Sequence, residues 1–421
     1  MTPPLPYRIH PQGLSIPARS TRLREANVRD VLQLLRRHSP CSRADLVRLS
    51  GLTAPTVSAC IANLQRRNLV NPLGHAGSNW GRPAGMLEFN ARHGYVVGVD
   101  IGGSNVRISM ADLNGTVIGR WSSALRRERS PEAVTDMIAA GVSRISQQQK
   151  VPARKILQLA VGAPGITDVV AGRVLSAPNL TDWHDVPLRD LLQRRTRIAT
   201  TVENDVNLGA LGEAWRGAAR NVANFVFLAI GTGVGAGIVL NDMLHHGANW
   251  SAGELGYMLL PGLSAEPPRM EETGVLENAV GGRNIERAWM EQANASHPAA
   301  ALRATDIFDL ATNGDNQGRD VLYTVAEQLA MAITNLSLVL DLSLVVLSGG
   351  VGRHPGLLRA IERRLERNQL ARPTVVIGSL KDEAQSYGAI WLALQAAETQ
   401  FFRSRTIKSV DESADPLIAV P

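Results

Sequence analysis

The sequence predicts a chain of two folded parts: a small helical domain with a β wing, followed by a larger α/β body of two related lobes. Residues 21–90 contain three short helical patterns and then two strand patterns. In the body, a strand, a glycine-rich turn and a second strand occupy residues 96–111, and the same order returns at residues 225–240. Because a repeated supersecondary unit implies a duplicated lobe, the body is expected to fold as two similar halves.

The charge of the chain is unevenly distributed. Residues 1–90 carry twelve arginines, no lysine and four acidic residues, which gives a net charge of +8, whereas the whole chain carries +6 and residues 91–421 therefore −2. A basic segment in front of a near-neutral body is the layout expected when one part of a protein meets nucleic acid. A solvated basic face without a partner is the alternative interpretation.

Composition and the absence of certain segments exclude several classes of protein. The 421 residues, of which 44% are hydrophobic, are enough for two or three domains of a soluble globular protein. There is no run of about eighteen apolar residues and no apolar core after a charged start, so we expect no membrane contact, no signal peptide and a cytoplasmic location. Cys41 and Cys60 are too few for a disulfide framework and are expected to be small apolar core residues.

The first part is expected to contain a helix-turn-helix. Residues 1–20 include five prolines and are expected to be a disordered lead-in to a domain over 21–90. Apolar residues at helical spacing predict a first helix over 23–38, and a second, short helix follows the capping residue Ser42 up to Gly51. Thr53 caps a third helix. Three helices with a glycine turn before the third are typical of a helix-turn-helix.

The third helix carries the candidate DNA contacts. Its buried stripe is formed by Val57, Ile61 and Leu64. Off this stripe it presents small and polar side chains that suit base edges in a major groove, namely Thr56, Ser58, Ala59 and Asn63. Arg43 and Thr53 are placed to reach phosphates. A domain that merely packs against the rest of the chain is the alternative.

Two strands near residues 69–71 and 86–89 are expected to form a wing. The glycine-rich segment 74–85 joins them, and Arg82 in Gly81-Arg82-Pro83 suits insertion into a minor groove. An ordinary turn is the alternative for these three residues alone. Taken with the net charge of +8, the helices and the wing predict a domain that binds double-stranded DNA.

The first lobe is expected to open with a phosphate-binding hairpin. A near-continuous apolar strand over 96–99 leads into residues 100–105, and a second strand follows over 106–111. Glycines in a tight hairpin let backbone N–H groups approach a phosphate, so the candidate nucleotide contacts are Gly102, Gly103 and Ser104. Asp100 at the mouth of the hairpin is placed to hold a magnesium-bound water. A simple hairpin turn is the alternative.

Asp205 is the candidate catalytic or ligand-binding carboxylate. Residues 197–202 are expected to form a strand and residues 207–215 a helix, which places Asn204 and Asp205 at the turn between them. A carboxylate at the C-terminal end of a strand faces the crevice in which α/β folds hold ligands. Asp205 is therefore a candidate general base with Asn204 as its hydrogen-bonding neighbour. Capping of the following helix is the alternative role for either residue.

The second lobe is expected to repeat the glycine hairpin. A buried strand over 225–230 ends in a glycine-rich turn over 231–237, in which Gly231, Thr232 and Gly233 are candidate phosphate contacts. A strand over 344–347 is followed by Gly349 and Gly350, which open a helix and are placed to seat a base or ribose. A helix over 384–397 closes the fold, and residues 403–421 are expected to be a loose tail.

These motifs, in this order, resemble the ROK family of repressors, uncharacterised reading frames and sugar kinases over roughly residues 23–400. The resemblance implies an actin-like, two-lobed ATPase fold over 93–400. Asp100-Ile101-Gly102-Gly103-Ser104 looks like the first phosphate loop of the family, and Gly231-Thr232-Gly233 like the second. Glu203-Asn204-Asp205 looks like the sugar site with its catalytic aspartate, which in the kinases takes a proton from the sugar hydroxyl that attacks the γ-phosphate.

Further sugar contacts follow from the same resemblance. Glu254, in Ser251-Ala252-Gly253-Glu254, matches a glutamate that binds sugar hydroxyls, and Glu277 matches a second one. Asn179 and Gly165 resemble further sugar-facing positions, with loop turns as their alternative role.

The sequence departs from the family pattern in one region. Tyr257 occupies the position of a histidine that serves sugar and zinc, so Tyr257 is the candidate sugar contact here. Pro268, Met270 and Val275 stand where the family has three zinc-binding cysteines. None of these replacements binds zinc well, so we expect no structural zinc. The loop is then held by packing of Met270 and Val275, or it is disordered.

The sequence leaves three functions open. The favoured one is a dimeric or tetrameric transcription regulator, with a repressor preferred, whose DNA affinity is changed by a sugar effector bound between the lobes. The second is a sugar kinase that carries a DNA-binding arm and uses Mg-ATP. The third is a regulator controlled by a protein partner. No other cofactor is expected.

Overall fold

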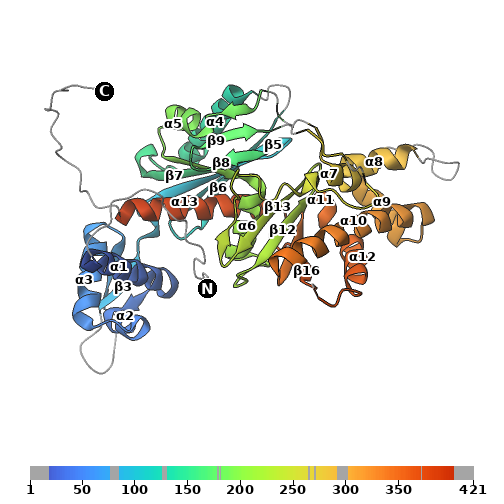
Figure 1. Cartoon of the computed structure of the whole chain (residues 1–421). Helices are drawn as coiled ribbons and strands as arrows, with labels where there is room; N and C mark the ends of the chain where they lie inside the picture. Colours follow the sequence, from blue (N-terminus) through green and yellow to red (C-terminus); the bar gives the residue numbers. More distant parts are fainter. Residues whose placement is uncertain are drawn as a thin grey trace, which may run out of the picture.

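A computed structural model describes residues 19–75, 85–125, 130–177, 180, 182–263, 266–269, 272–291, 302–370 and 372–402. The helical N-terminal domain lies at one end of a two-lobed body, beside the far end of the long helix α13 (Ala384–Phe402), as Figure 1 shows. Both parts that the sequence predicts are therefore present, in the predicted order.

The N-terminal domain is built on helices α1 (Arg19–His38), α2 (Arg43–Ser50) and α3 (Ala54–Arg66). The predicted caps are observed: the Ser42 side chain accepts from the backbone N–H of Asp45, and the Thr53 side chain from that of Thr56. The predicted stripe of α3 is fully buried. α1 begins four residues earlier than predicted, because the apolar pattern behind the prediction starts only at Leu23.

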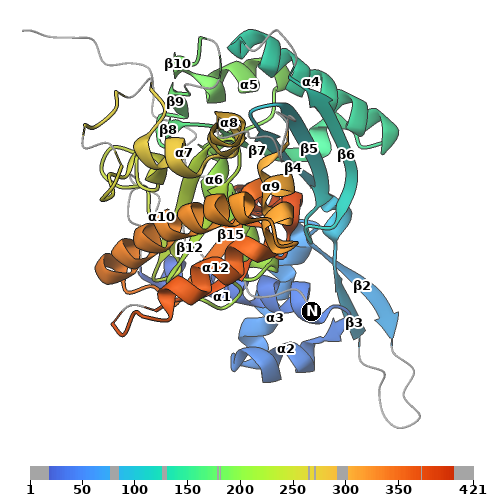
Figure 2. The same cartoon turned by 90° about the vertical axis from the view of Figure 1, so that its right-hand side faces the viewer.

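A three-stranded sheet completes this domain. β2 (Val70–His75) and β3 (Gly85–Phe89) pair antiparallel as the two sides of the predicted wing, which Figure 2 shows extending from the helices. A short strand that the sequence did not predict, β1 (Cys41–Ser42), pairs with β3 on its other side. Arg82 and the rest of the wing tip lie outside the described residues.

The first lobe is a five-stranded sheet in the order β11-β7-β4-β5-β6. Its strands are β4 (Tyr95–Ile101), β5 (Asn105–Asp112), β6 (Val117–Ala124), β7 (Ile156–Ala163) and β11 (Thr200–Asn204). The helices α4 (Pro131–Gln148) and α5 (Leu188–Thr196) pack against it, and a small sheet joins β8 (Ile166–Asp168), β9 (Arg173–Ser176) and β10 (His184–Val186). Two 3₁₀ turns, η1 (Ala91–His93) and η2 (Ala153–Lys155), precede β4 and β7.

The second lobe is a five-stranded sheet in the order β14-β13-β12-β15-β16. Its strands are β12 (Phe225–Ile230), β13 (Val234–Leu240), β14 (Met243–Leu244), β15 (Leu344–Ser348) and β16 (Thr374–Ile377). Its helices are α7 (Val275–Val280), α8 (Gly282–Glu291), α9 (Ala304–Thr312), α10 (Asn316–Leu340), α11 (Gly349–Gly352) and α12 (Pro355–Leu365). Figure 2 shows α10 and α12 covering one face of this sheet, with which they share a core. The 3₁₀ turns η3 (Leu255–Tyr257) and η4 (Lys381–Glu383) lie in its loops.

The two sheets confirm the duplication that the sequence predicts. In each, three strands that follow one another along the chain pair antiparallel, β4-β5-β6 and β12-β13-β14. In each, two later strands add in parallel beside the first of the three, β7 and β11 in one sheet and β15 and β16 in the other. The repeated strand, glycine turn and strand therefore marks the same place in both lobes.

Helices α6 (Asp205–Arg216) and α13 join the two lobes. Both helices belong to a core that also contains Val96 and Ala160 of the first sheet and Phe227 of the second. α13 is longer than the predicted helix over 384–397 and runs to Phe402, past the predicted end of the body at residue 400. None of the helices in the described part of the chain combines the length and apolar character needed to span a bilayer.

Candidate functional site

The junction of β11 and α6 differs from the turn that the sequence predicts. β11 runs through Asn204, and α6 begins at the next residue, Asp205. Asn204 Oδ1 accepts from the backbone N–H groups of Val206 and Asn207, at 2.9 and 3.0 Å, so the capping role left open in the sequence is observed for Asn204. Its Nδ2 donates to the carbonyl of Gly165 at 2.9 Å. The Asn204 amide is thus used to set the start of α6.

Asp205 is partly buried and interacts electrostatically with a second acid, the buried Asp100 at the end of β4. Both lie at the carboxyl edge of the first sheet, where Asp100 and Glu203 are each in register with Gly162 of β7. Burial raises the pKa of Asp205 to about 8, and the negative charge of Asp100 adds to the rise. Asp205 therefore keeps its proton to a higher pH than an exposed aspartate does.

Asp100 already has a cationic partner. Arg107 Nη1, from β5, lies 3.2 Å from Asp100 Oδ2, and the Asp100 side chain is 4% exposed. Burial raises the pKa of Asp100 to about 6, although Arg107 acts in the opposite direction. A magnesium-bound water at Asp100 would share this carboxylate with Arg107.

The second lobe contributes two more acids. Burial raises the pKa of Glu254 to about 7, and the charge of Glu277 adds to the rise. Glu277 Oε2 accepts from the backbone N–H of Val234 at 2.8 Å, and burial raises its pKa as well. The negative charge of Glu254 also raises the pKa of Asp205. Acidic groups of the two lobes therefore repel one another at this site.

A half-buried ion pair that the sequence did not predict involves Glu203, the residue before Asn204. His246 Nε2 is 2.8 Å from Glu203 Oε2, and Glu203 Oε1 accepts from Asn207 Nδ2 at 3.0 Å. Burial lowers the pKa of His246, but the hydrogen bond and charge of Glu203 outweigh it, so the pKa is raised overall. The ring of Trp250 contacts His246 edge-on at a centroid distance of 5.6 Å, with Trp250 held at φ 63°. Backbone strain of this kind clusters at functional sites.

The glycine loops of the second lobe are shorter than predicted. Only residues 231–233 form the turn, because β13 already begins at Val234. Gly235 and Gly237 are strand residues that lie against α6: a Cβ on Gly237 would be 2.7 Å from the Ala210 side chain. They are needed for packing.

Among the remaining glycines of the loops, Gly103, Gly231 and Gly350 have open space where a side chain would stand, whereas a Cβ on Gly233 would lie 3.0 Å from Glu277 Oε2. A Cβ on Gly231 would have only the backbone nitrogen of Gly350 at 4.0 Å, and a Cβ on Gly103 or Gly350 would meet nothing within 4 Å. Gly349 adopts φ 80° at the start of α11, as a tight turn requires. The backbones at Gly231 and Gly350 thus lie next to each other, with no side chain of either residue between them. The whole set of predicted nucleotide contacts stays a prediction: Asp100, Gly102, Gly103, Ser104, Gly231, Thr232, Gly233, Gly349 and Gly350.

Tyr257 holds the loop that follows it. Its hydroxyl donates to the carbonyl of Glu272 at 3.0 Å, and a Cβ on Gly274 would lie 2.2 Å from the carbonyl of Gly256. Val275 is buried, as one of the two alternatives for this loop expects. Among the described residues no group of three His, Cys, Asp or Glu side chains is placed to hold a metal ion, and the expectation of no structural zinc stays a prediction.

Two predicted site residues and one packing residue lie outside the described residues: Asn179, Arg82 and Met270. Their predicted roles remain untested predictions. The structure also adds Arg107, Glu203, His246 and Trp250 to the neighbourhood of the candidate site. The motif Glu203-Asn204-Asp205 indicates that Glu203 belongs to the site. No sequence pattern indicates its partner His246, which is 43 residues away.

The candidate DNA interface is the outer face of α3 and the start of α2. Ser58 and Ala59 are exposed on α3, and Arg43 is exposed at the first position of α2. Thr53 Oγ1 accepts from the backbone N–H of Thr56 and is also hydrogen-bonded to the Thr56 hydroxyl, 2.8 Å away. Asn63 Oδ1 accepts from Arg67 Nε at 2.7 Å, which leaves its amide N–H₂ group to donate to a base.

Comparison with known proteins agrees with this architecture. The ROK family model matches residues 96–396, and a winged helix-turn-helix DNA-binding model matches residues 24–71. A glucokinase of Halalkalibacterium halodurans is 29% identical over 315 residues, which are 72% of this chain and 95% of that protein. A xylose repressor of Bacillus spizizenii is 27% identical over 345 residues, 82% of this chain and 87% of that protein.

A solved ROK family transcriptional regulator, described as a homologue of the E. coli MLC protein, has a similar fold. It superposes with a TM-score of 0.75 at 22% identity and covers 90% of this chain and 98% of that one. At this identity the likeness concerns the fold. The family match spans both lobes and the acids between them, so the chain belongs to the ROK family and carries a winged helix-turn-helix DNA-binding domain at its N-terminal side.

Proposed function

We propose that this protein is a DNA-binding transcription repressor of carbohydrate-related genes, and that a sugar bound at the junction of the two lobes changes its DNA affinity. One observation carries the proposal: a single chain joins an exposed recognition helix to three neighbouring carboxyl groups with raised pKa values, those of Asp100, Asp205 and Glu254. Buried carboxyl groups are stabilised by hydrogen-bond donors. A sugar offers several hydroxyl donors at once.

The similarity to a xylose repressor supports the regulator. That similarity covers 82% of this chain, which requires both the DNA-binding domain and the lobes, whereas the similarity to a glucokinase covers 72%. D-xylose and D-glucose are therefore the first effectors to test. A homodimer or tetramer is part of the proposal, because two recognition helices related by symmetry reach two successive half-sites on DNA.

The experiment that tests this function measures sugar and DNA together. The full chain is screened by thermal shift against D-xylose, D-glucose and their phosphates, with and without magnesium and a nonhydrolysable ATP analogue. DNA selected by the protein from a randomised pool is then titrated in the presence and absence of the stabilising sugar. Stabilisation by sugar alone together with a change in DNA affinity supports the regulator. DNA binding that no sugar changes refutes it.

An ATP-dependent sugar kinase with a DNA-binding arm is the second candidate. The observation in its favour is Asp205 at the start of α6, whose raised pKa makes its ionised form a stronger base, together with the open space at Gly231 and Gly350. Bound Mg-ATP would supply the phosphoryl group. Within this chain, Asp205 would take the proton of the sugar hydroxyl, and the two glycine loops would hold the nucleotide. Sugar-dependent ATP turnover that Asp205→Asn abolishes would establish this activity.

A further inference from the structure

The far end of α13 is attached to the DNA-binding domain by a buried ion pair. Glu398 Oε2 accepts from Arg36 Nη1 of α1 at 2.8 Å, and the two side chains are only 11% and 8% exposed. Gln33 Nε2, one turn earlier on α1, lies 3.2 Å from the same oxygen. Since a carboxylate that is shielded from water and held by two donors has one geometry, this contact fixes how α1 sits on α13.

The last residue of α13 contacts the same domain at two more points. The Phe402 ring contacts the guanidinium groups of Arg29 on α1 and Arg67 after α3, which lie 5.1 and 5.5 Å from its centroid. Arg67 is also the donor to Asn63 on the recognition helix. The end of α13 is therefore connected to both α1 and α3, as the neighbouring positions of these elements in Figure 1 show.

The other end of α13 is packed rigidly against α6. A Cβ on Gly212 of α6 would lie 2.0 Å from the carbonyl oxygen of Ala384, and a Cβ on Gly388 of α13 would lie 1.8 Å from that of Leu208. The two helices thus touch backbone to backbone, with no side chain between them to yield. Close-packed contacts of this kind transmit displacement, so the two helices are expected to move as one unit.

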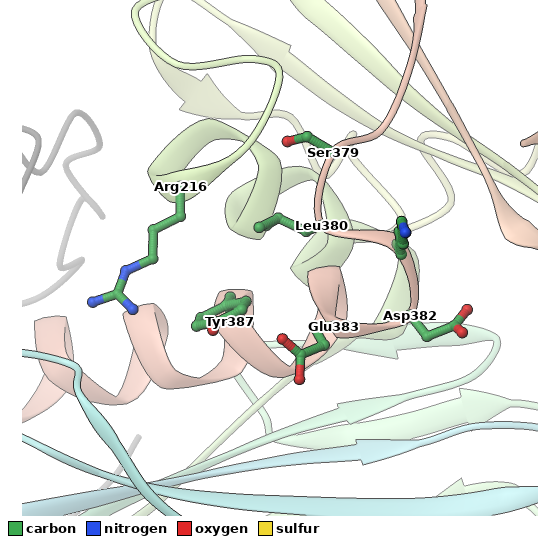
Figure 3. A pocket seen from close by; sticks show the side chains of 7 residues that line it. Arg216, Ser379, Leu380, Asp382, Glu383 and Tyr387 are labelled. Carbon is green, nitrogen blue, oxygen red and sulfur yellow. The ribbon is translucent and has the colours of Figure 1, made fainter.

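A buried carboxylate fastens the end of α6 to the loop that leads into α13. Glu213 is fully buried, and its Oε1 accepts from the backbone N–H of Leu380 at 2.9 Å while its Oε2 accepts from that of Ala218 at 2.6 Å. Arg216, the last residue of α6, and Tyr387 of α13 line a surface pocket of about 590 Å³ beside this loop. Figure 3 shows these two side chains together with those of the loop.

The start of α6 is the candidate sugar site. Asp205 is its first residue, and Asn204 caps it. A second connection starts from β11, the strand that precedes α6. Thr201 Oγ1 of this strand accepts from Gln158 Nε2 at 3.0 Å, and Gln158 Oε1 accepts from Gln400 Nε2 of α13, also at 3.0 Å. A contiguous series of contacts therefore connects Asp205 to the residues around Glu398.

We propose that Glu398 is the positioning residue through which a sugar bound at the β11–α6 junction sets the orientation of the DNA-binding domain. The inference rests on the proposed function. A sugar that pulls the two lobes together displaces α6, which carries α13 with it, and Glu398 passes the displacement to α1 through Arg36. The recognition helices of a dimer are thereby moved relative to their half-sites.

The test compares Glu398→Gln with the unchanged chain, using D-xylose and D-glucose as sugar probes and DNA selected from a randomised pool. Glutamine keeps the length of the side chain and removes its charge. In the unchanged chain the sugar is expected to alter DNA affinity by about tenfold, within the usual range of allosteric coupling. In Glu398→Gln, sugar affinity stays the same, while the sugar alters DNA affinity by less than about twofold.

The matched control is Glu362→Gln, at an exposed position of α12, which keeps the full sugar effect. An undiminished sugar effect in Glu398→Gln overturns the inference and leaves the proposed function standing. An unchanged chain whose DNA binding no sugar alters overturns both. A merely structural role for Glu398 would lower the melting temperature without changing the ratio of DNA affinities measured with and without sugar, and that result also counts against the inference.

A second measurement decides the question if Glu398→Gln fails to fold. Spin labels at Arg66→Cys, at the end of α3, and Arg359→Cys, on α12, report the distance between the recognition helix and the second lobe. The native Cys41 and Cys60 are buried, and labelled chains are diluted with unlabelled ones so that only distances within one chain are seen. The sugar is expected to shift this distance. A distribution that the sugar leaves unchanged overturns the inference.

Discussion

Gly162 of β7 is the residue that lets the acids of the candidate site come together. A side chain there would meet Asp205 Cα at 3.2 Å and Leu208 Cδ1 at 2.7 Å, so only glycine lets α6 begin directly above the strand. Asp100 and Glu203 pair with Gly162 on its two sides. The burial that raises the pKa of Asp205 to about 8 therefore comes from strands distant in sequence. The motif predicts where Asp205 stands, but its protonation state depends on this packing.

The pKa of Asp205 predicts how stability depends on pH. The folded chain holds this proton up to about pH 8, whereas the unfolded carboxyl releases it near its ordinary value of 3.8. The contribution to stability is complete below the unfolded value and is lost as pH rises through the folded one. Asp205→Asn removes the titration, so its melting temperature should fall less than that of the unchanged chain between about pH 5 and about pH 8.

Thermal unfolding at the two pH values, without added sugar, checks this expectation. Asp320→Asn, at an exposed position of α10, is the control and should keep the pH dependence of the unchanged chain. Equal slopes for the Asp205→Asn variant and the unchanged chain would contradict the burial argument.

The Glu203–His246 pair predicts a second pH effect, which belongs to the histidine. Because the pKa of His246 is raised, the charged pair is complete below the ordinary value of 6.5 and is lost as pH rises through the raised value. His246→Gln should therefore lower the free energy of unfolding by about 1 to 3 kcal/mol at about pH 5 and by less at about pH 9. Urea unfolding at the two pH values measures the difference. An equal loss at both would show that the imidazole charge contributes nothing.

Among the helices, α6 and α13 join the two lobes. The sequence predicts both helices but not the contact between them. Both helices are found where the periodicity places them, although α13 runs on to Phe402. Their contact is made by Gly212 and Gly388, residues that carry no hydrophobic signal. Periodicity reports which side chains are apolar, and it contains no information on where two backbones approach.

Gly212→Ala should disrupt this contact. The added methyl group would lie 2.0 Å from the carbonyl oxygen of Ala384, which belongs to a backbone that cannot give way easily. The free energy of unfolding should fall by roughly 3 kcal/mol or more, as for severe overpacking. Gly85→Ala is the control, since a Cβ there meets nothing within 4 Å, and it should cost less than about 1 kcal/mol. Chemical denaturation compares the two, and a Gly212→Ala variant as stable as the control would refute the close packing.

At the scale of the whole molecule, charge separates the two functions of the chain. The first 90 residues carry a net +8 and the remainder −2, and this division coincides with the boundary between the winged domain and the lobes. DNA affinity should therefore come from phosphate contacts made by the N-terminal domain, with a strong dependence on salt.

Arg43→Ala tests that expectation. Arg43 is exposed at the first position of α2, where it is placed to meet a phosphate. The variant should bind DNA more weakly at low salt, and the slope of log affinity against log salt should become shallower by about one unit. Arg359→Ala, an exposed arginine on α12 of the body, should leave the slope unchanged. Titrations over a range of salt concentrations measure both, and an identical slope for Arg43→Ala would exclude a phosphate contact at this residue.

Four features can be predicted from the sequence: the order of the domains, the three helices and the wing, the duplicated lobes, and the position of Asp205 between a strand and a helix. These features follow from local periodicity, capping residues and a repeated motif, all of which act between residues that are close in the chain. Three other features become visible only in the folded chain: Asn204 caps α6, Glu203 pairs with His246, and Glu398 pairs with Arg36. The partners in the last two contacts are separated by 43 and 362 residues, so folding alone brings them together.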